Sequence, residues 1–317
     1  MPLPIADFLP GAGSIICNSF GTATKFTRCH AQYPLKFIPT STHVDNLAAA
    51  YILSYGGGML SGDEVDMTIE LNKNADLLLM TQGSTKIFKD REQSAVAGIP
   101  ISRLPGRDGP VIDGASQTID AFVSPTSMLL LLPDPVTSFK HSIYTSYQKF
   151  HLTSDGTSTS QLVLLDWFTS GRIARGEKWH FKKYASKIDI RLDGRLLIRD
   201  NLVLEDENKE WMPISSFASR LHPHTCFATL IMIAPGQNEL SHVVQHCVEA
   251  FDRLSIGQVK APKDLIWSLS RLRHVENGVM VRVAGTTTEM VKNFLKNEAL
   301  ANLDTVIGHG MYEKLFS

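Results

Sequence analysis

A strict alternation of polar and apolar residues is the sequence feature that most restricts the fold. It covers Glu64–Leu71, within the stretch GGGMLSGDEVDMTIELNKNADLLLMTQGSTKIFK that starts at Gly56 and ends at Lys89. Successive side chains of a β-strand point to opposite faces, so the alternation predicts a strand with one apolar and one polar face. The polar positions are Glu64, Asp66, Thr68 and Glu70. One face is therefore suited to packing, and the other to water, cations or a polar partner.

Short runs with β-strand character dominate the rest of the chain. They are rich in β-branched, aromatic and aliphatic residues and are separated by Gly, Pro, Asn and Asp. The runs cover residues 15–20, 35–38, 48–54, 117–123, 128–132, 143–152, 160–168, 188–192, 196–204, 225–233 and 279–284. Asp193-Gly194 predicts a tight hairpin, because both residues tolerate positive φ. We therefore expect a mainly β fold of packed mixed β-sheets, in sandwich-like or β-helix-like layers.

Two α-helices are expected, both in the C-terminal part. In Glu239–Leu254 the apolar residues fall on one stripe, and Gly257 follows the end. A second, shorter helix is expected over Glu289–Leu300, where Thr286 and Glu289 have capping-box spacing.

Length and composition favour one domain. The chain has 317 residues, enough for a large core, and neither a repeat nor a linker divides it, so we expect a single domain over residues 1–317. The proline- and glycine-rich segment 91–114 is expected to be a long loop.

Charge and cysteine usage narrow the functional class. The net charge of −1 argues against a nucleic-acid or acidic-membrane footprint, and no apolar run is long enough to span a bilayer. The four cysteines are scattered, which suits reduced thiols better than a disulfide framework. The apolar N-terminus lacks a basic leader and is a poor signal peptide. We expect a cytoplasmic protein.

Carboxylates around the alternating strand are the first candidate site. Asp63, Glu64, Asp66 and Glu70 offer oxygen ligands that hold a divalent cation weakly enough to release it, although a solvated strand face explains the same pattern. The glycines at 56–58 precede a strand and lack the Gly-Lys-Ser/Thr ending of a phosphate loop, so they predict no nucleotide site.

Two histidine clusters are the second candidate. His222, His224 and Cys226 alternate and could share one face, although Pro223 disturbs that geometry and a buried thiol is ordinary at the start of a strand. His242 and His246 stand four residues apart on the expected helix, a spacing that can chelate a metal.

A charged segment follows residue 165. Basic and acidic residues alternate there with aromatic ones: Asp166, Trp167, Arg172, Arg175, Glu177, Lys178, Trp179, His180, Phe181, Lys182 and Lys183. Basic and aromatic residues together can bind single-stranded nucleic acid, but Arg and Trp anchors of a protein interface explain them better. Ser84 and Thr85 have no neighbouring base in the sequence, so no nucleophile is predicted.

Several short motifs, in order, resemble those of one protein family. They are Tyr33-Pro34-Leu35-Lys36, Ser61-Gly62-Asp63, Thr81-Gln82-Gly83-Ser84-Thr85-Lys86, Leu132-Pro133-Asp134-Pro135, Gly171-Arg172, Gly176-Glu177 and the segment 201–205, with weaker likeness at 278–285. The chain departs from the family pattern at Ser61, which replaces a glycine, and at Met80, which replaces a threonine. In order and spacing the set resembles the UreD/UreH family of urease accessory proteins.

The resemblance implies a function without catalysis. Such proteins are scaffolds and metallochaperones that bind apo-urease together with the helical protein UreF and, through UreF, the GTPase UreG. They assist nickel insertion, so Ni²⁺ would pass transiently, no cofactor would be tightly bound, and GTP hydrolysis would belong to the partner. Asp63 and its neighbouring carboxylates would then lie on the nickel route, through an internal polar tunnel. The motif residues Thr81, Gln82, Thr85, Lys86, Asp134, Arg172 and Glu177 would serve partner contacts.

Two other functions stay open at this point. One is a metal-dependent hydrolase that uses His222, His224 and Cys226. The other is a single-stranded nucleic-acid binder centred on residues 172–183.

Overall fold

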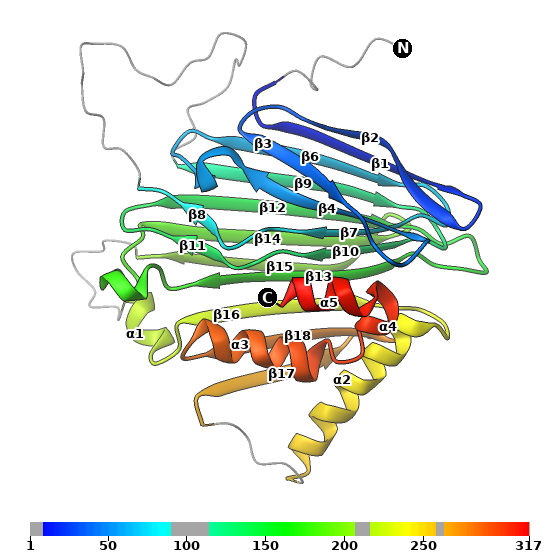
Figure 1. Ribbon diagram of the computed structural model, residues 1–317. Coiled ribbons are helices and arrows are strands. Elements are labelled where there is room, and N and C mark those ends of the chain that lie inside the picture. Colours follow the sequence, from blue (N-terminus) through cyan, green and yellow to red (C-terminus); the bar gives the residue numbers. More distant parts are fainter. Residues whose placement is uncertain (1–8, 90–113, 207–215, 258–262, 317) are drawn as a thin grey trace.

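The computed structural model describes residues 9–89, 114–206, 216–257 and 263–316. Two β-sheets are stacked, and most of the helices lie on the outer face of the second sheet (Figure 1). Among these residues, none of the helices combines the length and apolar character that a membrane crossing requires. The expected loop over 91–114 lies outside the described residues, except for Gly114.

The first sheet has seven strands in the order β15-β14-β12-β9-β6-β1-β2. Their bounds are β1 Ala12–Phe20, β2 Ala23–Ala31, β6 Glu64–Leu71, β9 Ala115–Val123, β12 Ile143–Leu152, β14 Lys183–Leu192 and β15 Arg195–Glu205.

The second sheet has eleven strands, eight of them in the order β17-β18-β16-β13-β10-β7-β4-β3, and β5, β8 and β11 lie beside that path. Their bounds are β3 Leu35–Thr40, β4 Leu47–Ser54, β5 Gly58–Met59, β7 Asp76–Met80, β8 Thr85–Ile87, β10 Met128–Leu132, β11 Val136–Ser138, β13 Gln161–Thr169, β16 Cys226–Ile233, β17 Leu265–Arg271 and β18 Gly278–Gly285.

The chain alternates between the two sheets through the centre of the fold. From β4 to β14 the long strands fall in turn on the second and the first sheet, and neighbours within each sheet pair in parallel. Antiparallel hairpins close the ends, including β14–β15 at Asp193-Gly194, where φ is 48° and 78°. The packed mixed sheets with sandwich-like and β-helix-like layers are thus confirmed.

The alternating strand has the predicted faces. In β6 the apolar positions Val65, Met67, Ile69 and Leu71 are buried in the core between the sheets. Asp66, Thr68 and Glu70 point to the outer face of the first sheet and are exposed, and Glu64 is half-buried. Because every second residue of the strand is buried, the alternation determines which side chains lie in the interior.

A second apolar core lies between the second sheet and the C-terminal helices. The helices are α1 Phe217–Leu221, α2 Glu239–Ser255, α3 Thr288–Phe294, α4 Asp304–Ile307 and α5 His309–Leu315. The apolar stripe of α2 (Leu240, Val243, Val244 and Cys247) packs into this core, as its spacing predicts.

The second expected helix differs in detail. The Thr287 side chain, rather than that of Thr286, accepts the capping bond, from the Met290 N–H at 3.2 Å. The α-helix then gives way to a π-helical turn over Leu295–Ala299. The additional helices α1, α4 and α5 have four to seven residues, too short for a clear helical period in the sequence.

Candidate functional site

A carboxylate from the centre of β13, Asp166, lies between the two sheets and is half-buried. The Ser186 hydroxyl donates to its Oδ2 at 2.7 Å, and Gln148 Nε2 lies 3.4 Å from its Oδ1. Burial raises the pKa of the Asp166 carboxyl above the ordinary 3.8, and the nearby Asp200 carboxylate raises it further. The two hydrogen bonds offset only part of the desolvation penalty. A nearby cation would therefore stabilise the charged form of the Asp166 carboxyl.

Asp166 belongs to a row of polar residues at inward-facing positions of neighbouring strands, which we call the polar seam. It consists of Gln117, Ser146, Gln148, Asp166 and Ser186. Ser146, Gln148 and Ser186 are buried, although most of their neighbours in the core are apolar. Buried polar side chains normally find hydrogen-bond partners. Ser146 Oγ and the nearby Tyr184 hydroxyl find none in the described part of the chain, so the interior has polar groups that water or a hydrated cation can satisfy.

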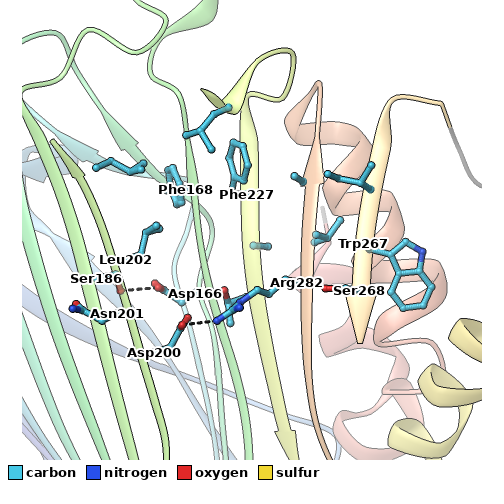
Figure 2. A pocket seen from close by; sticks show the side chains of 17 residues that line it. Asp166, Phe168, Ser186, Asp200, Asn201, Leu202, Phe227, Trp267, Ser268 and Arg282 are labelled. Carbon is cyan, nitrogen blue, oxygen red and sulfur yellow. Dashed lines mark hydrogen bonds and ion pairs between the residues drawn. The ribbon is translucent and has the colours of Figure 1, made fainter. Parts of the chain in front are cut away.

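Two cavities border the polar seam. The larger is a cleft of about 500 Å³ between β14 and β15 on one side and β16, β17 and β18 on the other (Figure 2). The smaller is a cavity of about 60 Å³ between the sheets. Asp166 lines both, so its carboxylate lies where the open cleft and the interior approach each other.

An ion pair spans the cleft beside Asp166. Arg282 of β18 donates through Nη2 to Asp200 Oδ1 of β15 at 2.5 Å (Figure 2). This contact ties the edge of the first sheet to the second sheet. Asp166, Asp200 and Arg282 place two carboxylates and one guanidinium on the cleft floor, within walls formed largely by apolar residues.

Two of the sequence motifs meet at the smaller cavity. Thr81, Thr85 and Asp134 line it. The Gly83 N–H donates to Asp134 Oδ2 at 2.8 Å, and the Asp134 N–H donates to Thr81 Oγ1 at 2.7 Å. Burial raises the pKa of the Asp134 carboxyl as well. The corner 81–86 and the turn 132–135 thus form one hydrogen-bonded unit, from which Gln82 and Lys86 are exposed to solvent.

The candidate carboxylates of β6 lie elsewhere. Asp66 and Glu70 are on the outer face of the first sheet, opposite to the polar seam. Asp63 closes the turn before the strand, since its Oδ2 accepts the Leu60 N–H at 2.7 Å. A role of Asp63, Glu64, Asp66 and Glu70 as nickel ligands stays a prediction, and the structure gives Asp63 a turn-closing role in addition.

The fold places the members of each histidine cluster in different environments. His222 is exposed in the loop after α1, whereas Cys226 is buried against the C-terminal helices, where burial raises its thiol pKa to about 12. His224 packs edge-on against Phe227. On α2, His242 lies 4.0 Å from Glu239, and His246 is partly buried. No group of three or more His, Cys, Asp or Glu residues suited to holding a metal ion occurs within the described ranges.

The charged segment after residue 165 is largely used inside the fold. Arg172 and Glu177 form a two-pronged ion pair, with Nε–Oε2 at 2.7 Å and Nη2–Oε1 at 2.5 Å, and the guanidinium lies over the Phe139 ring. Hydrogen bonds from Arg172 lower the pKa of the Glu177 carboxyl. Trp179 and Phe181, which would have to stack on bases, are buried in an aromatic cluster with Phe217. The fold therefore buries the aromatic rings that the nucleic-acid hypothesis requires, although Arg175, His180 and Lys182 stay exposed.

Sequence reasoning grouped Asp166 with the charged segment and missed its neighbours Ser146, Gln148 and Ser186. A signal was present in β12, where Ser146 and Gln148 occupy the buried phase of an alternation that also includes Tyr144 and Phe150. A polar residue at a position where the alternation predicts an apolar one is unusual, because burying a polar group is costly. It therefore indicates a site in the interior.

The fold and site define a β-rich protein with polar residues buried between its sheets and an open cleft at one edge.

Comparison with known proteins identifies the family. A family model described as "UreD urease accessory protein" matches residues 11–311. Urease accessory protein D of Arabidopsis thaliana is 31% identical over 323 residues, which cover 95% of this chain and 99% of the relative. Urease accessory protein 4 of Cryptococcus neoformans var. grubii is 29% identical, with 96% and 95% covered. An uncharacterised ureD-like protein of Schizosaccharomyces pombe is 31% identical, with 85% and 86% covered.

This chain therefore belongs to the UreD family of urease accessory proteins.

Proposed function

We propose that this protein is a cytoplasmic scaffold and metallochaperone for urease. It binds apo-urease with a UreF-type accessory protein, and a UreG-type GTPase through UreF, and it assists nickel insertion into the urease active site. Family membership supports the urease part of the proposal, and the polar interior supports the nickel part. The chain carries no catalytic step of its own in this proposal, and GTP hydrolysis belongs to the GTPase.

The observation that carries the proposal is the position of Asp166 between two cavities. A nickel ion in transit needs oxygen ligands that bind it weakly and in series, and carboxylate, amide and hydroxyl oxygens bind divalent nickel more loosely than imidazole or thiolate does. The polar seam supplies such oxygens from Gln117 to Asp166, and the Thr81–Asp134 unit adds more at the smaller cavity. On the outer face, Asp63, Glu64, Asp66 and Glu70 would bind nickel only before it enters or after it leaves the interior.

Affinity purification tests the proposal against its alternatives. When this chain is tagged and purified from cells that make urease, we expect urease, the UreF-type protein and the UreG-type GTPase to copurify with it. The eluate is expected to contain more nickel than that of an untagged control. Stoichiometric zinc with a turnover that follows this chain would support the hydrolase using His222, His224 and Cys226 instead. RNA in place of the urease proteins would support the nucleic-acid binder.

Asp166→Asn tests the nickel route. The variant is expected to lower urease activation about tenfold or more, as for the loss of a well-placed charged ligand, while the free energy of unfolding at pH 7 stays equal or rises. The sign follows from the raised pKa, because such a carboxyl destabilises the folded state as pH rises above the unfolded value of 3.8, and asparagine removes that penalty. Asparagine still accepts the Ser186 hydroxyl. Normal urease activation by the variant would exclude Asp166 from the route.

Asp189→Asn is the matched control. Asp189 is a buried carboxylate that pairs with Arg199 on the outer side of the first sheet, and hydrogen bonds from Arg199 lower its pKa to about 2. Its stabilising effect is present above the ordinary 3.8 and is lost as pH falls toward 2. The control is therefore expected to lose stability at pH 7 while the remaining folded protein activates urease normally. Measurements of unfolding and of activation separate the two variants.

A further inference from the structure

The two sheets end unequally on the side of β15. The first sheet stops there, and within the described part of the chain β15 pairs only with β14. The second sheet continues past β16 to β18 and β17. The Asp200–Arg282 ion pair joins β15 to β18 across the cleft, and β18 and β17 extend beyond the edge of the first sheet (Figure 1). The second sheet therefore has an inner surface that no strand of the first sheet covers.

This uncovered surface has the composition of a packing face. Its exposed residues are Ile266, Ser268 and Arg282, which line the cleft of about 500 Å³. Ile266 is 59% exposed, although isoleucine is among the residues most often buried. The opposite faces of the same strands, which carry Val281 and Val283, pack on the helices. One side of β17 and β18 thus packs on the helices, and the other is open at Ile266 and Ser268.

The free edge of β15 borders this surface. With 11 residues, β15 is the longest strand in the described ranges, and it carries the exposed apolar residues Leu196 and Val203. Long edge strands with exposed apolar side chains are templates for pairing with another chain. One of the two edge strands of the second sheet, β3, is shorter and contains Pro39, which cannot donate a hydrogen bond to an added strand.

One more strand beside β15 fits this space. Strands within a sheet lie about 4.8 Å apart and stacked sheets about 10 Å apart, so the next strand of the first sheet would lie directly over β18. Its backbone would satisfy the free edge of β15, and an apolar side chain would contact Ile266. Beside it, a polar side chain would meet the Asp200–Arg282 ion pair.

We propose that the groove between β15 and β17 receives an extended segment of a protein partner, with apolar residues at alternate positions, that joins the first sheet by β-strand addition. Only the choice of probes rests on the proposed function: purified UreF-type accessory protein and apo-urease. Because Asp166 lines the same groove, a segment bound there would also cover one side of the polar seam.

Ile266→Lys tests the proposal, with Ile256→Lys as the matched control. Ile256 follows α2 and is 67% exposed, so both variants exchange an exposed isoleucine for lysine at little cost to folding. The full chain and each variant are titrated with each of the two probes. Ile266→Lys is expected to weaken one of the two complexes about tenfold or more, as for loss of a central apolar contact, and Ile256→Lys to leave both unchanged.

Hydrogen–deuterium exchange supplies a readout that a surface contact without strand pairing would not give. Peptides over residues 195–205 are expected to gain protection in the affected complex and to stay unprotected at that edge in the free protein. Equal binding by both variants, with no added protection over 195–205, would overturn the inference. Protection of this edge in the free protein would also overturn it, because a segment of the chain itself would then occupy the groove. If the unaltered protein binds neither probe, the proposed function is refuted. This outcome differs from failure of the inference, in which the unaltered protein and both variants bind equally well.

Discussion

A cell that lacks this protein is expected to make the normal amount of urease polypeptide with almost no urease activity. The reason is that the proposed defect lies in metal insertion, after synthesis and folding of the enzyme. The family assignment over residues 11–311 motivates this expectation. Urease purified from the deletion strain should contain little nickel, which metal analysis measures directly beside activity and protein abundance.

Complementation makes the experiment specific to this chain. The wild-type gene should restore activity and nickel content together. The Asp189→Asn variant should restore both in proportion to the amount of folded protein that remains. A deletion strain with comparable urease activity and nickel content would contradict the functional assignment. Loss of the urease polypeptide itself would point to a role in synthesis or folding instead of metallation.

Gly171→Ala is expected to destabilise the protein by about 3 kcal/mol or more, enough to remove most of the folded protein at growth temperature. Gly171 has φ of +121°, a region that is essentially restricted to glycine. A Cβ atom there would lie 2.2 Å from the Glu177 carbonyl oxygen and 3.1 Å from that of Ser138. Since both are backbone atoms, the loop at Glu177 and the end of β11 at Ser138 would have to move apart. Chemical denaturation measures the loss.

Gly176→Ala, five residues later in the same loop, is the control. Gly176 also has positive φ, at +71°, but a Cβ atom there meets nothing within 4 Å. Only the left-handed backbone penalty applies, about 1–2 kcal/mol. Equal losses for the two variants would show that the close approach at Gly171 relaxes easily. A much larger loss for Gly171→Ala would establish that the loop carrying Arg172 and Glu177 is fixed by this backbone contact.

Part of this protein follows from local pattern alone. The alternation in β6 determines which residues are buried, because the two faces of a strand alternate whatever the strand pairs with. The Asp193-Gly194 hairpin and the helix α2 follow in the same way from turn chemistry and from a 3.6-residue apolar period. Family membership is also readable from the order of the short motifs, each of which is weak alone.

The site depended on contacts between distant residues. Asp166 stands in a charged stretch of the sequence, and only the stacking of the sheets turns its side chain toward Gln148 and Ser186 in the interior. Likewise Thr81 and Asp134, 53 residues apart, meet because β7 and β10 are neighbours in parallel register.

Sequence by itself therefore determined the class of fold and the phase of each strand, which local sterics and hydrophobic burial set. Tertiary structure decided which polar residues share the interior and where the edge of β15 stays open. The physical reason is that sheet order and register join residues far apart in the chain, and burial acts on a carboxylate such as Asp166 only after those strands have assembled.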